Sequence, residues 1–294
     1  MVFNKPVIGV DVGGTSIGIG RIEPKIIPEY QTYHITSSGT VKQTVNEIIT
    51  SIEKVYDTAV AGIGVGVPSL VNTESGIVYN VQNIPSWKEV HLKDILESHF
   101  NKPVYLNNDA NCFAIGEKYF FKGREFRNMV GITLGTGMGA GIIINNKLYS
   151  GVNCGAGEFC SIPYLDKTIE DYCSGQYFLN EHHVSGKEMF EKARSSDKHA
   201  LTVFSTFGEH LGEAIKIILF ALSPEAIFLG GSVSRSYPYF KDSMWKTIES
   251  FPYPETVKNL ILETTDHPYI GILGAAALCF EDLGIAIEDI AQLD

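Results

Sequence analysis

The sequence predicts an α/β protein of two similar domains that face each other across a cleft. Short apolar strands alternate with amphipathic helices along the chain, as in α/β folds. This alternation starts twice from a pair of strands joined by a glycine-rich turn, once at residues 7–22 and again at residues 128–145. We therefore expect one domain over residues 1–118 and a second over residues 119–294, with a C-terminal helix that can pack back on the first domain.

In the first half, a hairpin opens the predicted fold. Its strands span residues 7–12 and 16–22, with Gly13-Gly14-Thr15 as the turn. Residues 41–56 carry apolar side chains at helical spacing, which predicts an amphipathic helix. The other expected elements are strands near 29–35, at 59–67 and at 104–106, and helices at 92–100 and 112–120.

The second half repeats this order. Strands are expected at 128–134 and 140–145, separated by a glycine-rich turn, with a further strand end at 147–150. The remaining expected elements are helices at 168–178, 187–193, 201–222, 239–250 and 271–280, and strands at 226–229 and 260–263. Pro224 is expected to end the long helix, because proline cannot continue it. Residues 281–294 have no assignment.

Composition excludes several classes of function. The formal net charge of −11 disfavours nucleic acid and anionic membranes as partners, because like charges repel. No apolar run of about 18 residues occurs, so we expect no membrane span. Residues 1–6 lack the apolar core of a signal peptide. Five scattered cysteines fit reduced thiols better than disulfides, so we expect a cytoplasmic protein.

Three glycine-rich turns each follow an apolar strand. They are Asp11-Val12-Gly13-Gly14-Thr15, Gly135-Thr136-Gly137-Met138-Gly139 and Gly230-Gly231-Ser232. Glycine lets backbone N–H groups approach phosphate oxygens closely, and small hydroxyls add donors. Neither a P-loop nor the dinucleotide-binding fingerprint is present. The turns instead suggest two hairpins, one from each domain, that hold the β- and γ-phosphates of ATP.

A polar cluster, Asn107-Asn108-Asp109, lies where a predicted strand meets the N-terminus of a helix. Ligands in open α/β sheets bind outside the carboxyl ends of the strands, so a carboxylate here could take a proton from a substrate hydroxyl. The structural alternative is that Asp109 or Asn108 caps the helix. Both roles are compatible if an asparagine is the cap and the helix dipole keeps Asp109 ionised.

These motifs resemble a known superfamily, that of sugar kinases, actin and Hsp70. Residues 11–15 resemble its first phosphate loop, residues 135–141 its second, and residues 229–232 its adenosine loop. Asn108-Asp109-Ala110-Asn111 with Gly116-Glu117, and Gly155-Ala156-Gly157-Glu158, match the ROK family of bacterial sugar kinases and repressors. The resemblance extends from about residue 7 to residue 277.

The resemblance implies a ribonuclease H-like fold in each domain and ATP-dependent transfer to a hexose hydroxyl. Asp109 matches the catalytic base. The implied sugar-binding residues are Asn108, Asp109, Glu158, Glu170, Ser69 and Asn83. Asp11 matches the acid that positions Mg²⁺, through water. The implied nucleotide-binding residues are Asp11, Gly13, Gly14, Thr15, Gly135, Thr136, Gly137, Gly230 and Gly231.

The sequence departs from the ROK pattern at the zinc site. Many members carry Glu-x-Gly-His followed by clustered cysteines, whereas here the run is Glu158-Phe159-Cys160-Ser161. Ser161 stands at the histidine position, and the segment between Glu158 and Glu170 lacks the cysteine cluster. We therefore expect no zinc. Ser161 is expected to contact the sugar through its hydroxyl.

The expected reaction is ATP- and Mg²⁺-dependent phosphorylation of a hexose, with glucose to glucose 6-phosphate as the leading case because the chain resembles zinc-less glucokinases. The sequence leaves open N-acetylglucosamine, N-acetylmannosamine, fructose and a β-glucoside. A sugar-responsive transcription regulator is the alternative. It would need an N-terminal helix-turn-helix, for which the strand starting at Val7 leaves no room. The resemblance also implies a homodimer.

Overall fold

The computed structural model describes residues 5–23, 29–285, 288 and 290. The chain divides into two compact units. Unit 1 contains Met1–Phe126, Gly141–Ala156 and His267–Asp294, and unit 2 contains Arg127–Ala140 and Gly157–Asp266. The single domain boundary at residue 118 stays a prediction. Of the tail left unassigned, residues 286–287, 289 and 291–294 lie outside the described part.

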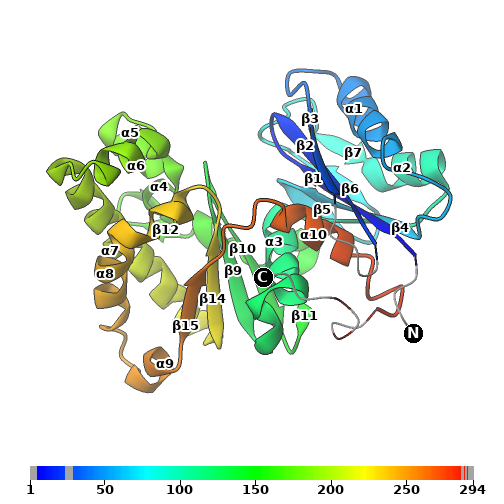
Figure 1. Ribbon diagram of the computed structural model, residues 1–294. Helices are drawn as coiled ribbons and strands as arrows, with labels where there is room; N and C mark the ends of the chain where they lie inside the picture. Colours follow the sequence, from blue (N-terminus) through cyan, green and yellow to red (C-terminus); the bar gives the residue numbers. More distant parts are fainter. Residues whose placement is uncertain (1–4, 24–28, 286–287, 289, 291–294) are drawn as a thin grey trace. The chain divides into compact units, whose positions relative to one another are not determined.

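Unit 1 is built on a five-stranded sheet of order β3-β2-β1-β4-β8 (Figure 1). The strands are β1 (Val7–Val12), β2 (Ser16–Ile22), β3 (Glu29–His34), β4 (Gly62–Val67) and β8 (Val104–Asn108). The β1–β2–β3 meander is antiparallel, whereas β4 and β8 continue the sheet parallel to β1. Parallel pairing aligns Val67 with Asn108, so the chain leaves β1, β4 and β8 at one edge of the sheet.

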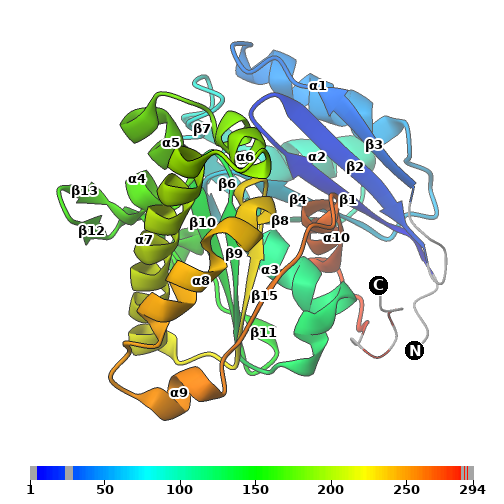
Figure 2. The ribbon, with the colours of Figure 1, turned by 60° about the vertical axis from the view of Figure 1, so that its left-hand side comes forward.

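Helices cover both faces of this sheet. On one face, α1 (Val41–Glu53) and α2 (Leu92–Phe100) bury apolar side chains in the same core as Ile8 and Val10 of β1 (Figures 1 and 2). On the other face, α10 (Ile270–Ala277) packs against β1 and β4. A Cβ atom on Gly64 would lie 1.7 Å from the carbonyl oxygen of Ala275, so only glycine permits this approach.

Helix α3 (Asp109–Phe120) packs against α10 in the same unit. The two helices approach so closely that a Cβ atom on Gly274 would lie 1.6 Å from the carbonyl oxygen of Cys112, so glycine is required there. A small antiparallel sheet of β5 (Leu70–Asn72), β6 (Ile77–Tyr79) and β7 (Glu89–His91) completes this part of unit 1. The sequence did not predict this sheet, because runs of three residues are too short to show a period.

The second sheet has the order β11-β10-β9-β14-β15. Its strands are β9 (Met129–Leu134), β10 (Met138–Ile144), β11 (Lys147–Leu148), β14 (Ala226–Gly230) and β15 (Ile261–Thr264). Strand β10 starts in unit 2, and the chain passes into unit 1 at Gly141. Strands β9 and β14 are parallel and pair Thr133 with Gly230, so the turns that follow them leave the same edge.

Helices of unit 2 pack on its part of this sheet, and α7 and α8 lie side by side (Figure 2). The helices are α4 (Ile169–Cys173), α5 (Gly175–His182), α6 (Gly186–Arg194), α7 (Lys198–Leu222), α8 (Tyr237–Ile248) and α9 (Pro254–Lys258). The single helix predicted at 168–178 is wrong. Ser174 is extended and separates α4 from α5, and its hydroxyl accepts the N–H of Gln176 to cap α5.

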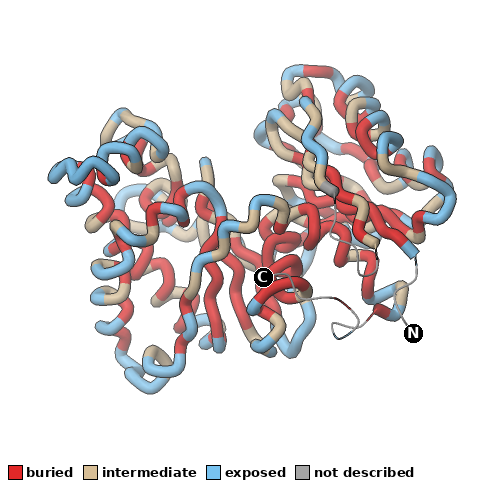
Figure 3. Tube along the Cα trace, viewed as in Figure 1, coloured by how far each residue is buried: buried red, intermediate tan, exposed pale blue. Residues whose placement is uncertain are grey.

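Short elements connect the larger ones. They are the 3₁₀ turns η1 (Lys122–Glu125), η2 (Val152–Cys154), η3 (Phe159–Ser161) and η4 (Val233–Ser236), and the hairpin of β12 (Pro163–Tyr164) and β13 (Lys167–Thr168). Each unit has its own apolar core, and Figure 3 shows the sheet strands as largely buried. Within the described part, no helix has the length and apolar character needed to cross a membrane.

Candidate active site

The first glycine-rich turn of unit 1 joins β1 to β2. The N–H of Gly13 donates to the carbonyl of Ser16 at 2.8 Å, which closes the turn. Thr15 is exposed, so its hydroxyl can reach a ligand. Asn83 lies against Gly14, since a Cβ atom there would be 2.8 Å from the Cβ of Asn83. The structure therefore brings Asn83, a predicted sugar contact, beside the first glycine-rich turn.

Asp11 is the acidic residue of this turn, in the penultimate position of β1. Burial raises the pKa of its carboxyl to about 6, although the side chain keeps some exposure. A Cβ atom on Gly271, in α10, would lie 2.9 Å from its Oδ2 atom. A desolvated carboxyl group is more stable as the anion when a cation lies beside it. Asp11 therefore fits the role of holding a hydrated Mg²⁺.

No group of three or more acidic, histidine or cysteine side chains that could hold a metal is found among the described residues. A metal at Asp11 would therefore take most of its ligands from water and from a phosphate. Mg²⁺ is bound in this way in many nucleotide sites, with only one or two carboxylates from the protein.

Asn108 is the N-cap of α3. Its backbone is extended, and its Oδ1 atom accepts the N–H groups of Ala110 at 2.9 Å and Asn111 at 3.4 Å. The cap predicted at this junction is thus Asn108 and not Asp109. Asp109 is the first residue of the helix, half-buried, with Oδ1 accepting the N–H of Ala110 at 2.8 Å. A negative charge is favoured at this end of a helix.

Ser69, a predicted sugar contact, lies beside Asn108. The Nδ2 atom of Asn108 donates to the carbonyl of Ser69 at 3.2 Å. The hydroxyl of Ser69 donates to the carbonyl of Tyr79 in β6. The loop after β4 is therefore fixed on one side by β6 and on the other by the residue that precedes Asp109.

A buried hydrogen-bond network is centred on Asn107, two residues before Asp109. The Oδ1 atom of Asn107 accepts the side-chain N–H of Asn111 at 2.8 Å and the thiol of Cys154 at 3.1 Å. It also accepts the backbone N–H of Asn108 at 2.9 Å. The sequence did not reveal this network, because Cys154 is 47 residues from Asn107 along the chain.

In unit 2, the second glycine-rich turn follows β9. The N–H of Gly135 donates to the carbonyl of Gly137 at 2.9 Å. Thr136, at the tip, is exposed. The start of α5 holds the turn, because the N–H of Gly175 donates to the carbonyl of Gly135 at 2.8 Å. Glu170 of α4 accepts the N–H of Met138.

The third glycine-rich turn follows β14 at the same sheet edge. Gly231 has φ = +88°, and a Cβ atom there would lie 2.4 Å from the carbonyl oxygen of Leu134, so glycine is required. Ser234 of η4 donates its hydroxyl to the carbonyl of Gly231 at 2.7 Å. Gly231 and Ser232, directly after β14, are exposed.

Glu158 and Ser161 flank Cys160 in and beside η3, and both are exposed. The thiol of Cys160 donates to Oε2 of Glu158 at 3.5 Å. Burial raises the pKa of this thiol to about 11, and the carboxylates of Glu158 and Glu170 add to the rise. Both predicted sugar-binding glutamates therefore lie near Cys160, whose thiol is un-ionised at neutral pH.

The predicted site residues fall in both units. Unit 1 holds Asp11, Gly13, Gly14, Thr15, Ser69, Asn83, Asn108 and Asp109. Unit 2 holds Gly135, Thr136, Gly137, Glu158, Ser161, Glu170, Gly230 and Gly231. In each unit, most of these residues follow the carboxyl end of a parallel strand, where α/β folds bind their ligands.

The topology of the two open sheets is that of the actin-like ATPase fold. A solved structure of a ROK family glucokinase from Streptomyces griseus, in complex with glucose and AMPPNP, matches with a TM-score of 0.77. The two sequences are 27% identical, and the match covers 93% of this chain and 98% of the other. The expected fold class is confirmed.

The chain belongs to the ROK family, whose family model matches residues 7–282. A glucokinase from Thermotoga maritima is 28% identical, over 94% of this chain and 98% of its own length. A glucokinase from Halalkalibacterium halodurans is 30% identical, over 84% of this chain and 86% of its own. A xylose repressor from Bacillus spizizenii is 30% identical, over 87% of this chain and 72% of its own. The relatives thus include enzymes and regulators.

Proposed function

We propose that this protein is an ATP-dependent sugar kinase that phosphorylates a hexose hydroxyl, with glucose as the first candidate substrate. The observation that carries the proposal is the position of Asp109. Asn108 is the N-cap of α3, so the Asp109 carboxylate lies at the start of the helix and is not needed as the cap. The comparisons with glucokinases support the same activity.

In the proposed reaction, Asp109 acts as general base. The substrate hydroxyl oxygen forms a bond to the γ-phosphorus of ATP, and its proton passes to the Asp109 carboxylate. The bond between the γ-phosphorus and the bridging oxygen breaks, and ADP leaves with that oxygen. Such a transfer depends mainly on positioning and charge stabilisation, because the transition state spreads charge over the phosphoryl oxygens.

The remaining predicted residues take supporting roles. The turns at 11–15 and 135–139 would hold the phosphates, the turn at 230–232 the adenosine, and Asp11 a hydrated Mg²⁺. Mg²⁺ neutralises the charge that develops on the phosphates. Asn108, Ser69, Glu158, Glu170, Ser161 and Asn83 are the proposed sugar contacts. We further propose that the protein is a cytoplasmic homodimer without zinc.

An assay of sugar-dependent ADP release tests the proposal. The purified protein is given MgATP with glucose, N-acetylglucosamine, N-acetylmannosamine, fructose or a β-glucoside in turn. At least one hexose, with glucose expected, should release ADP in proportion to the sugar 6-phosphate or equivalent ester formed. Binding of a sugar without ADP release would favour a regulator, as in the xylose repressors, over a kinase.

Two variants locate the chemistry. Asp109→Asn should lower kcat by at least about 100-fold, the usual contribution of a general base, with little change in sugar affinity. Asp242→Asn, an exposed residue of α8, is the matched control and should keep wild-type activity. Full activity in Asp109→Asn would show that another group takes the proton.

A further inference from the structure

Glu170 holds the second glycine-rich turn through its side chain. The Oε2 atom accepts the backbone N–H of Met138, the residue that follows Gly137, at 2.9 Å. The Oε1 atom accepts the side-chain amide of Gln176 in α5 at 3.2 Å. Both carboxylate oxygens therefore have a donor within unit 2, and the side chain has a fixed orientation.

Gly137 shows how closely the carboxylate approaches the turn. A Cβ atom on Gly137 would lie 2.4 Å from Oε2 of Glu170, closer than real Cβ contacts. Any side chain at this position would therefore displace the carboxylate or the turn. The observed position of the Glu170 carboxylate therefore requires glycine at position 137.

The segment around Glu170 holds the turn at two more positions. The Ser174 hydroxyl donates to the carbonyl of Thr136 at 3.2 Å, and the N–H of Gly175 donates to the carbonyl of Gly135 at 2.8 Å. The segment from α4 to α5 therefore contacts the backbone of three of the four residues from Gly135 to Met138. Glu170 makes the one charge-assisted contact of the set, and such hydrogen bonds are the stronger ones.

We propose that Glu170 is a positioning residue for the nucleotide, which sets the shape of the phosphate-binding turn even when no sugar is bound. This inference rests on the proposed function, because it takes the turn at 135–139 to contact phosphate. It also has a consequence for substrates. A sugar that donates a hydrogen bond to the same carboxylate would also change the shape of the turn. Sugar binding should therefore change the affinity for the nucleotide, and nucleotide binding should change the affinity for the sugar by the same factor.

The test is the affinity for AMPPNP with Mg²⁺, measured by calorimetry with no sugar present. Glu170→Ala should weaken binding by about tenfold, the effect of one hydrogen bond to a charged group. Glu170→Gln keeps an oxygen acceptor for Met138 and should stay within about threefold of wild type. Glu188→Ala, an exposed glutamate of α6, is the matched control and should bind as wild type.

A second variant probes the contact from the other side and does not depend on Glu170→Ala folding. Gly137→Ala should weaken AMPPNP binding by about tenfold in the wild-type background. In the Glu170→Ala background the clash is absent, so the same change should have less than about a threefold effect.

The outcomes separate the two proposals. If wild-type protein fails to bind AMPPNP, the proposed function is wrong. If wild type binds and Glu170→Ala binds equally well, only the role of Glu170 is wrong. Equal losses in Glu170→Ala and Glu170→Gln, or additive effects of Gly137→Ala and Glu170→Ala, would also overturn it.

Discussion

The thiol of Cys154 donates to the Oδ1 atom of Asn107 at 3.1 Å, and that same oxygen accepts the side-chain N–H of Asn111. These three residues are buried, and the same Asn107 oxygen accepts the backbone N–H of Asn108, the residue before Asp109. The backbone that carries the proposed base is therefore held by a single amide oxygen with several donors.

Asn107→Leu should destabilise the protein by about 1–3 kcal/mol, because it leaves buried donors without an acceptor. Denaturant unfolding of wild type and variant measures the difference. The matched control is Asn180→Leu at an exposed position of α5, which should change stability by less than about 0.5 kcal/mol. Equal effects in both variants would mean that the Asn107 network adds no stability.

Trp87 is fully buried, and its Nε1–H donates to the hydroxyl of Thr44 in α1 at 2.6 Å. Thr44→Val keeps the shape of the side chain but removes the acceptor, so the indole N–H is left unsatisfied. We expect a loss of about 1–3 kcal/mol in the free energy of unfolding. Thr202→Val, at an exposed position of α7, should lie within about 0.5 kcal/mol of wild type.

The raised pKa of Asp11 predicts that the stability of the protein without ligands depends on pH. Its folded-state pKa of about 6 lies above the unfolded value of 3.8, so the folded state binds the extra proton. The free energy of unfolding should therefore fall as pH rises from about 4 to about 7, by up to about 3 kcal/mol. Asp11→Asn should remove this part of the pH dependence and be more stable than wild type near neutral pH.

Unfolding of the two proteins in urea at a series of pH values checks this prediction. Asp242→Asn, at an exposed position of α8, is the control and should give the wild-type profile. Parallel pH profiles for wild type and Asp11→Asn would contradict the assigned burial of the Asp11 carboxyl. Adding MgAMPPNP should raise the stability of wild type more than that of Asp11→Asn, since a cation favours the carboxylate.

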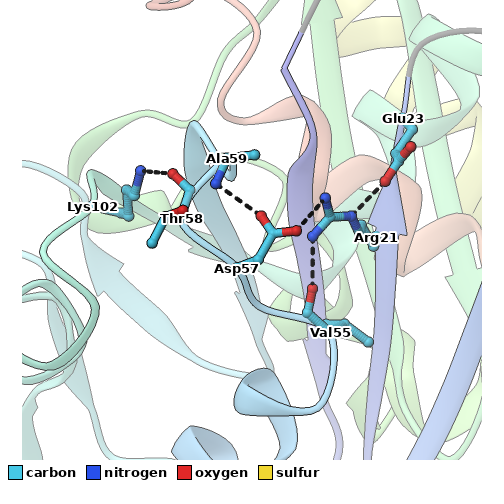
Figure 4. A network of polar contacts seen from close by, with 7 residues as sticks. All are labelled: Arg21, Glu23, Val55, Asp57, Thr58, Ala59 and Lys102. Atoms are coloured by element: carbon cyan, nitrogen blue, oxygen red, sulfur yellow. Dashed lines mark hydrogen bonds and ion pairs between the residues drawn. The ribbon is translucent and has the colours of Figure 1, made fainter.

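Arg21 connects the end of β2 with the loop after α1 (Figure 4). Its Nε atom lies 2.6 Å from Oε1 of Glu23, Nη1 donates to the carbonyl of Val55 at 3.0 Å, and Nη2 lies 3.0 Å from Oδ2 of Asp57. In the same loop, Asp57 accepts the N–H of Ala59, and Lys102 donates to the carbonyl of Thr58.

Arg21→Lys should lower stability by about 1 kcal/mol although it keeps the charge, because an ammonium group cannot reproduce the planar arrangement of donors. Lys102→Met removes one exposed contact of the same loop and should change stability by less than about 0.5 kcal/mol. Thermal unfolding in low and high salt compares them. If the loss of stability in Arg21→Lys disappears at high salt, the contribution of Arg21 is electrostatic and does not depend on the planar arrangement of its donors.

Much of the fold could be predicted from the sequence, since the apolar runs of β1, β4, β9 and β14 are short and each is followed by glycine or proline. The helix cap at Asn108 could also be predicted, because asparagine is a preferred residue directly before a helix. The break at Ser174 was missed, although Ser174-Gly175 is a turn-like pair, because the flanking residues continue a helical apolar pattern.

Contacts between segments distant in sequence could not be predicted in the same way. Glu170 and Met138 are 32 residues apart, and nothing local indicates that one holds the backbone of the other. The motif resemblance gave Glu170 a role toward sugar only. The exposure of Glu158 and Ser161, and the proximity of Cys160 to the carboxylates of Glu158 and Glu170, likewise depend on the tertiary packing around η3.

The packing of α10 on β1, β4 and α3 has a consequence for synthesis. Unit 1 is assembled from three stretches of the chain, and the last of them begins at His267, after Asp266, the last residue of unit 2. On the ribosome, the sheet face that carries Gly9 and Gly64 stays uncovered until residues 270–277 emerge. Unit 2 is therefore complete in sequence before unit 1, although β1 of unit 1 precedes every strand of unit 2.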